Sequence, residues 1–259
     1  MYHLATIAPK PMAQALQSAT LIYALIVTVV AGLVLLARLV VTWAAEVFLH
    51  SIPIAGGWFK SLELVELSVV VLFAALGIGI GAASRQLPAK TPLTLKSLAL
   101  VLVFPLVFFS SYWLRYHLWI HHMTTQSDLP RQQITEMANL ALKRESGSSG
   151  FWGYYQTTTQ MPILPATGAD LQRMVADPHW FRSELIRFSG IEPGVFSMIF
   201  NGAGWVVRLV YLILAAVTSL IYFLKGLAWA DTQRLRQLTQ TQGKTGGESE
   251  ETTGGLNPH

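Results

Sequence analysis

The chain has 259 residues, of which 52% are hydrophobic and only 12% are charged, and its formal net charge is +4. Soluble domains carry about a quarter charged residues, so this composition excludes an ordinary soluble protein. The absence of cysteine excludes a disulfide framework, a thiolate nucleophile and a cysteine-ligated metal or iron–sulfur site. The basic residues are too dispersed to predict direct nucleic-acid binding.

Four windows lack nearly all charge over about 20 residues, the length needed to cross the hydrocarbon core of a bilayer. The first window is too long for the apolar region of a signal peptide, and residues 1–20 contain a single Lys or Arg, Lys10. We therefore predict an uncleaved anchor and an all-α integral membrane protein with four transmembrane helices. The windows lie at about 21–41, 64–83, 97–116 and 205–224.

Loop charge predicts the orientation of these spans. Arg85, Lys90 and Lys96 follow the second span without an intervening acid, and the flank after the fourth span is also basic. By the positive-inside rule both segments face the cytoplasm, which places both termini there in a multi-pass protein of the bacterial inner membrane. The predicted organisation is a cytoplasmic N-terminus (1–20), three spans (21–122), an extracytoplasmic lobe (123–202), a fourth span (203–228), and a cytoplasmic basic flank with a disordered tail (229–259).

The extracytoplasmic lobe is predicted to be small and mainly helical. Its first helix is expected over 127–146, with Ile134, Met137 and Leu140 along one side. A stretch rich in aromatic residues and threonine follows, and its two prolines predict an irregular path. Two short helices are expected after it. Exposed aromatic side chains on such a lobe would mark a partner surface, and the candidates are Trp152, Tyr154, Tyr155, Trp180 and Phe181.

Three arginines are predicted to form a charge cluster near the outer ends of the spans. Arg38, Arg115 and Arg208 lie inside or at the edge of apolar windows, where a charge is costly and either pairs or snorkels. One interpretation is a vestibule that attracts anions. The interpretation we favour is a set of structural salt bridges. The acidic residues expected at the same level are Glu46, Glu63 and Glu66.

A glycine pair and a histidine cluster can each be interpreted as either functional or structural. Gly77 and Gly81 form a small-xxx-small pattern, for which packing inside the bundle is favoured over dimerisation. His117 and His121 lie one helical turn apart, beside His122, so a zinc or copper ion with a third ligand is conceivable. The favoured interpretation of these histidines is polar tips at the membrane interface, and we expect no cofactor.

The second half of the chain carries a family resemblance. The third span ends in W-x-x-x-H (Trp113, His117), and the fourth opens with VVRLVYLIL, which contains Arg208. The polar, basic stretch GLAWADTQRLRQL then leads into the cytoplasm. From about residue 97 onward the chain thus resembles membrane proteins of integrating conjugative elements and conjugative plasmids. The resemblance implies an accessory role in mating-channel assembly or DNA transfer, and it offers no catalytic residues.

The sequence shows no GxSxG, HExxH or paired-carboxylate motif. We therefore predict a non-enzymatic inner-membrane scaffold or accessory subunit of an envelope-spanning assembly, such as a conjugative transfer or secretion apparatus. The expected partners are the lipid bilayer, other membrane or envelope proteins, and a second copy of the chain. The alternatives are a small anion channel or transporter that uses the arginine cluster, and a metal-dependent enzyme at His117 and His121.

Overall fold

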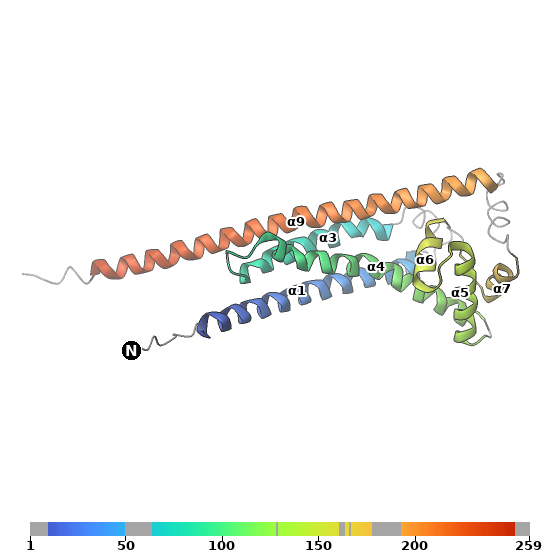
Figure 1. The fold of residues 1–259 in the computed structure, drawn as a ribbon, viewed down its shortest axis with the longest axis horizontal. Helices are drawn as coiled ribbons and strands as arrows, with labels where there is room; N and C mark the ends of the chain where they lie inside the picture. Colours follow the sequence, from blue (N-terminus) through green and yellow to red (C-terminus); the bar gives the residue numbers. More distant parts are fainter. Residues whose placement is uncertain are drawn as a thin grey trace, which may run out of the picture. The chain divides into compact units, whose positions relative to one another are not determined.

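All regular structure in the described part of the chain is helical (Figure 1). This computed structural model describes residues 10–49, 64–127, 129–160, 164–165, 167–177 and 193–251. Four helices are long and apolar enough to cross a membrane, which confirms the predicted all-α, four-span class. Their candidate spans are Gln17–Val47, Ser68–Gln86, Leu93–Thr125 and Gly204–Gln237.

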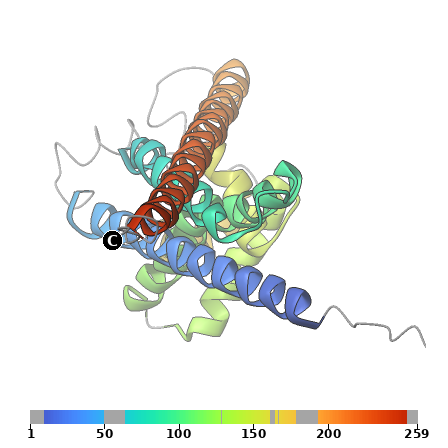
Figure 2. The ribbon, with the colours of Figure 1, turned by 90° about the vertical axis from the view of Figure 1, so that its left-hand side faces the viewer.

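The helices differ greatly in length. The long ones are α1 (Lys10–Ala44), α3 (Leu64–Ala83), α4 (Leu93–Thr125) and α9 (Pro193–Glu251), and the short ones are α5 (Arg131–Ser146), α6 (Gly150–Gln160) and α7 (Gly168–Ala176). A π-helical turn, Ala45–Leu49, follows α1, and a 3-10 turn, Ser84–Gln86, follows α3. Figure 2 shows α9 as one continuous helix, orange to red, seen close to end-on.

Two helices extend beyond their predicted ends. Helix α4 continues through Thr125, so the three histidines lie on it. Helix α9 continues to Glu251, past Gln242, after which a disordered tail was predicted. Extending an existing helix needs no new nucleus, because each added residue gains one backbone hydrogen bond. Residues 252–259 of the predicted tail lie outside the described residues.

The chain divides into two compact units. The first comprises Met1–Val34, Phe73–Phe104 and Val217–His259, and the second comprises Leu35–Leu72 and Pro105–Ala216. The first unit therefore contains part of α3 and the later part of α9. The second contains the three short helices, and both units include portions of α1, α4 and α9.

In the first unit, α3 and α9 approach each other backbone to backbone. A Cβ atom built on Gly77 would overlap the backbone oxygen of Ser219, and one built on Gly81 would overlap that of Phe223. Gly226 lies opposite them on α9, and its own Cβ atom would be 2.6 Å from a backbone oxygen of α3. Small residues allow such close contact between membrane helices. The pattern of Gly77 and Gly81 therefore serves the packing of α3 against α9 within one chain.

The first unit also contains an arginine that binds the end of α3. Nη2 of Arg234 on α9 donates to the backbone oxygens of Ser84 (2.8 Å), Arg85 (2.7 Å) and Leu87. Its Nη1 atom lies 3.6 Å from Oδ1 of Asp231, one turn earlier on α9. Arg234 thus supplies donors to backbone oxygens in and just after the 3-10 turn that follows α3, and it ties this turn to α9.

In the second unit, α5, α6 and α7 form a small core with the end of α4. Residues of α4 contribute to this core directly, so the lobe is built on a span instead of folding separately. The buried residues are Tyr116, Ile120, Met123, Ile134, Ala138, Ala141, Leu142, Tyr154, Leu171 and Met174. A lobe of this size buries too little apolar surface to be stable alone, which explains why it packs against a membrane helix.

The buried face of α5 differs from the predicted one. Ile134 is buried, but Leu140 is 60% exposed, and the buried positions continue through Ala138 and Ala141. These positions recur at the helical spacing, and alanine allows α6 and α7 to approach closely. Met137, the third residue of the predicted side, also packs against the core, so Leu140 is the one of the three that is exposed. The helix ends at Gly147, whose φ of 76° lies in the left-handed region that favours glycine.

Helix α6 replaces the irregular path that was predicted after α5. Aromatic residues and threonine have modest helix propensity, and tertiary contacts outweigh it here. Asn139 Oδ1 accepts a hydrogen bond from the Gly150 backbone N–H at 2.9 Å, at the start of the helix. Tyr154 enters the lobe core, while Phe151 and Tyr155 make ring contacts with Phe109 of α4. Of the two short helices expected next, α7 is present, and the second falls outside the described residues.

Candidate functional site

The three arginines singled out from the sequence all lie in the second unit, and each one bonds to another segment. Arg38 on α1 is fully buried. Its Nη2 atom donates to the backbone oxygen of Phe108 at 3.2 Å and to Ser111 Oγ at 2.8 Å, both on α4. Thr42 Oγ1 donates back to the Arg38 carbonyl at 2.8 Å. The guanidinium of Arg38 therefore links α1 to α4 at a buried position.

Arg115 on α4 forms an ion pair with Glu46, one of its three predicted partners. The distance from Nε to Oε1 is 3.1 Å, and both side chains are partly exposed. Glu46 lies in the π-helical turn that follows α1, so this pair is a second link between α1 and α4. Glu63 and the side chain of Glu66 lie outside the described residues.

Arg208 on α9 is 5% exposed and binds the aromatic helix α6. Its Nη1 atom donates to the Tyr155 backbone oxygen, and Nη2 donates to Thr158 Oγ1 at 2.7 Å. The guanidinium also lies over two rings, 4.4 Å from the centroid of Tyr155 and 4.9 Å from that of Tyr112. Cation–π contact strengthens when the cation is shielded from water, as it is here. Arg208 thus joins α9, α6 and α4.

Aromatic rings surround Arg208 and form a cluster that we call the α6 aromatic cluster. Tyr155 is its centre, because its ring contacts aromatic rings of α4, α6 and α9. Most of these rings are edge-on to Tyr155, and the ring of Phe151 is stacked on it. Edge-to-face and offset arrangements are the favourable ones for ring pairs. The members are Phe109, Tyr112, Phe151, Trp152, Tyr155 and Trp205, with neighbouring centroids 5.0–6.4 Å apart.

These contacts favour the structural interpretation of the arginines. All three guanidinium groups bond to carbonyl, hydroxyl or carboxylate oxygens of other segments, and Arg38 and Arg208 are buried as they do so. A charge at this depth is costly unless it is satisfied in this way. The sequence prediction missed Ser111 and Thr158 as partners. The signal for Ser111 was its place beside Ser110 in an otherwise apolar span.

The histidines lie along the last part of α4. His117 is partly buried and its ring lies edge-on to Trp113 at 4.3 Å and to Tyr116 at 5.3 Å, whereas His121 and His122 are exposed. Among the described residues, no three side chains of His, Asp or Glu are close enough together to hold a metal ion. The ring contacts of His117 match the interfacial interpretation of this cluster.

The candidate partner residues divide into exposed and buried ones. Trp152 is 55% exposed, and Tyr155 is partly covered by Arg208. Tyr154 is buried in the lobe core, so it is not part of any exposed surface. Burial raises the pKa of the Tyr154 hydroxyl, which therefore stays neutral. Trp180 and Phe181 lie outside the described residues.

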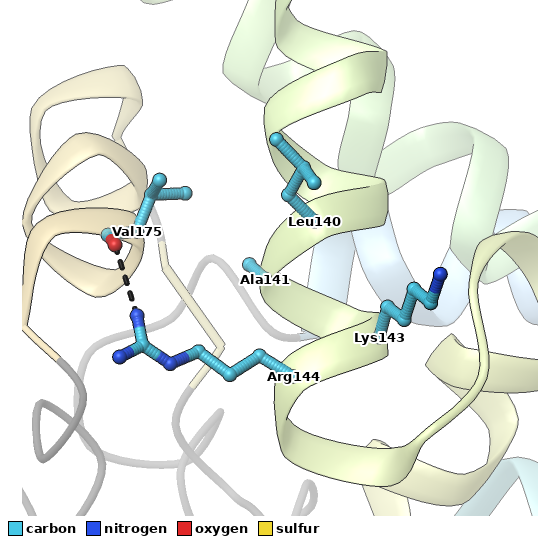
Figure 3. A pocket seen from close by; sticks show the side chains of 5 residues that line it. All are labelled: Leu140, Ala141, Lys143, Arg144 and Val175. Atoms are coloured by element: carbon cyan, nitrogen blue, oxygen red, sulfur yellow. Dashed lines mark hydrogen bonds between the residues drawn. The ribbon is translucent and has the colours of Figure 1, made fainter.

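A hollow of about 370 Å³ lies between α5 and α7 (Figure 3). Leu140, Ala141 and Val175 line it, and Arg144 reaches across it to donate to the Val175 backbone oxygen at 3.0 Å. Lys143 extends from the other side of α5, away from α7. The hollow therefore combines an apolar wall with the guanidinium of Arg144.

No family model, curated protein or solved structure matches this chain.

Replacing Arg208 with glutamine should loosen α6. The variant loses charge-assisted bonds to Tyr155 and Thr158, each worth about 1.5–3 kcal/mol. We expect backbone amide hydrogen exchange in peptides covering α6 to rise at least about tenfold, because 1.4 kcal/mol corresponds to a factor of ten. Arg236→Gln, an exposed arginine on the same helix, is the matched control. Equal exchange in both variants would contradict the anchoring role of Arg208.

Proposed function

We propose that this protein is a non-enzymatic scaffold or accessory subunit of an envelope-spanning assembly. It is a multi-pass protein of the bacterial inner membrane, with both termini in the cytoplasm and the lobe of α5, α6 and α7 outside. The orientation is supported by the uncompensated basic loop after α3 and by the basic flank of α9. A conjugative transfer or secretion apparatus is the proposed assembly, supported by the resemblance that begins near residue 97.

The observation that supports this proposal most strongly is that three arginines of the second unit bond to other segments of the chain. Arg38, Arg115 and Arg208 hold helices to one another and to the lobe. Such bonds hold the helices and the lobe together, and they engage part of each guanidinium group that an anion pathway would need. A rigid lobe carried on membrane helices is suited to positioning a partner protein.

The hollow between α5 and α7 is the proposed contact for that partner. In the described part of the chain, two large hydrophobic side chains outside the candidate spans are well exposed, Leu140 and Trp152. Leu140 lies at the hollow beside Arg144 and Lys143. A partner would complement this surface with an apolar side chain that packs against Leu140 and a carboxylate next to it that pairs with the basic charge.

Photo-crosslinking in the native cell tests this proposal. A benzophenone side chain at position 140 should form one crosslinked product of defined mass with an envelope or membrane protein, identified by mass spectrometry. The same group at Gln133, an exposed position on α5, is the control and should crosslink at least about tenfold less. A protein that shows no product at 140 and elutes alone as a monomer in mild detergent would contradict the proposal. So would anion flux in liposomes that is lost in Arg38→Gln.

A further inference from the structure

We infer that α6 is a membrane-contacting helix of the lobe, with Trp152 inserted at the headgroup–acyl boundary of the bilayer that the spans cross. This contact is separate from the spans and from the hollow between α5 and α7. In this inference, the exposed side of the α6 aromatic cluster contacts lipid and not another protein.

The composition around α6 suits a lipid contact. No Asp, Glu, Lys, Arg or His occurs between residues 146 and 169, although the neighbouring helices α5 and α7 are rich in charge. Within α6, the polar groups are the hydroxyls and amides of Thr, Tyr and Gln. Placing such groups at the headgroup level costs little, whereas a charged side chain in the acyl region would be expensive. Tryptophan and tyrosine are enriched at this level of the membrane.

The exposed surface of α6 is continuous with the apolar surface of the spans. The ring of Trp152 lies 5.6 Å from the ring of Phe109 on α4, and Tyr155 lies 6.1 Å from Trp205 on α9. Trp205 and Trp113 are themselves about half exposed on candidate spans. Trp152 thus contacts Phe109 on α4 directly and reaches Trp205 on α9 through Tyr155, and both of these residues belong to candidate spans.

The contact with Phe109 also indicates a depth. Phe109 precedes Trp113 by four residues, which is about 6 Å along a helix. Leu106, one turn earlier still, is 68% exposed in the middle of the apolar run of α4. Trp152 therefore lies beside the part of α4 between the exposed Leu106 and the exposed Trp113. Arg208 holds α6 at that level through Tyr155 and Thr158.

Site-directed spin labelling tests this inference, because the chain has no native cysteine. Trp152→Cys carries the label in the full-length protein, reconstituted into vesicles of phosphatidylcholine and phosphatidylglycerol. Leu106→Cys is the lipid-facing control, and Gln133→Cys is the aqueous control. Collision rates of the label with molecular oxygen and with a nickel chelate report lipid and water, respectively.

We expect the oxygen-to-nickel collision ratio at position 152 to exceed that at position 133 at least threefold and to approach that at position 106. A ratio equal to that at position 133 would show a water-exposed helix. Low collision rates with both reagents would show that protein, either a second copy or a neighbouring segment, covers α6. Either outcome overturns the inference.

Brominated lipid provides a second measurement that avoids the cysteine substitution. The fluorescence difference between the unchanged protein and Trp152→Phe isolates the emission of Trp152. In vesicles of phosphatidylcholine brominated at acyl carbons 6 and 7, we expect this difference to fall by more than half. An unquenched difference would contradict the lipid contact even if the labelled variant had lost its fold.

Discussion

Replacing Gly81 with valine should lower the free energy of unfolding by about 3 kcal/mol. The new Cβ atom would overlap the Phe223 backbone oxygen, so α3 and α9 would have to separate. Overpacking at a close helix contact costs about 1–3 kcal/mol when side chains adapt, and the backbone of a neighbouring helix adapts poorly. Titration with sodium dodecyl sulfate in mixed micelles, followed by circular dichroism, measures the change.

Gly32→Val on α1 is the matched control for this experiment. Nothing lies within 4 Å of a Cβ atom built on Gly32, so the substitution meets open space. Valine is a slightly better helix former than glycine, and we expect a change within about 0.5 kcal/mol. If Gly81→Val were as well tolerated as Gly32→Val, the close contact between α3 and α9 would be refuted.

Replacing Arg38 with alanine should cost about 3 kcal/mol. The variant loses the bonds from Nη2 to Phe108 and Ser111 and leaves a cavity at a fully buried position. Removing one partner of a buried charged contact has an effect of this size, because the remaining polar groups lose their donor. Arg38→Lys should be intermediate, since lysine keeps the charge but lacks the planar fork of the guanidinium.

A double-mutant cycle isolates the contact between α1 and α4. Ser111→Ala alone should cost about 1 kcal/mol, and the two substitutions together should cost less than the sum of the single effects by at least about 0.5 kcal/mol. The same titration provides all four free energies of unfolding. Strictly additive effects would show that Arg38 and Ser111 do not interact.

The sequence was most informative about the four candidate spans. A stretch of about 20 apolar residues identifies a membrane helix without any knowledge of its neighbours, because the bilayer and not another helix determines its length. The prediction that Arg115 has an acidic partner at its own level rested on the same reasoning, and the structure pairs it with Glu46.

The short helices show where such reasoning fails. Leu140 was predicted to lie on the same side of α5 as Ile134 and Met137, yet it is exposed, whereas Ala138 and Ala141 are buried. The segment of α6 was expected to be irregular because two prolines follow its aromatic and threonine residues, yet Gly150–Gln160 is helical. In both cases the decisive factor is packing against other helices, which a local pattern does not contain.

By itself, the sequence determined the helical class and the four candidate spans, since these follow from hydropathy along the chain. Only the tertiary structure decided which groups the arginines bind. Arg38 meets Ser111 across 73 positions, Arg208 meets Thr158 across 50, and Arg234 meets Ser84 across 150. Contacts over such separations depend on which helices become neighbours, and that choice is made by the summed packing of whole helix faces rather than by any local run of residues.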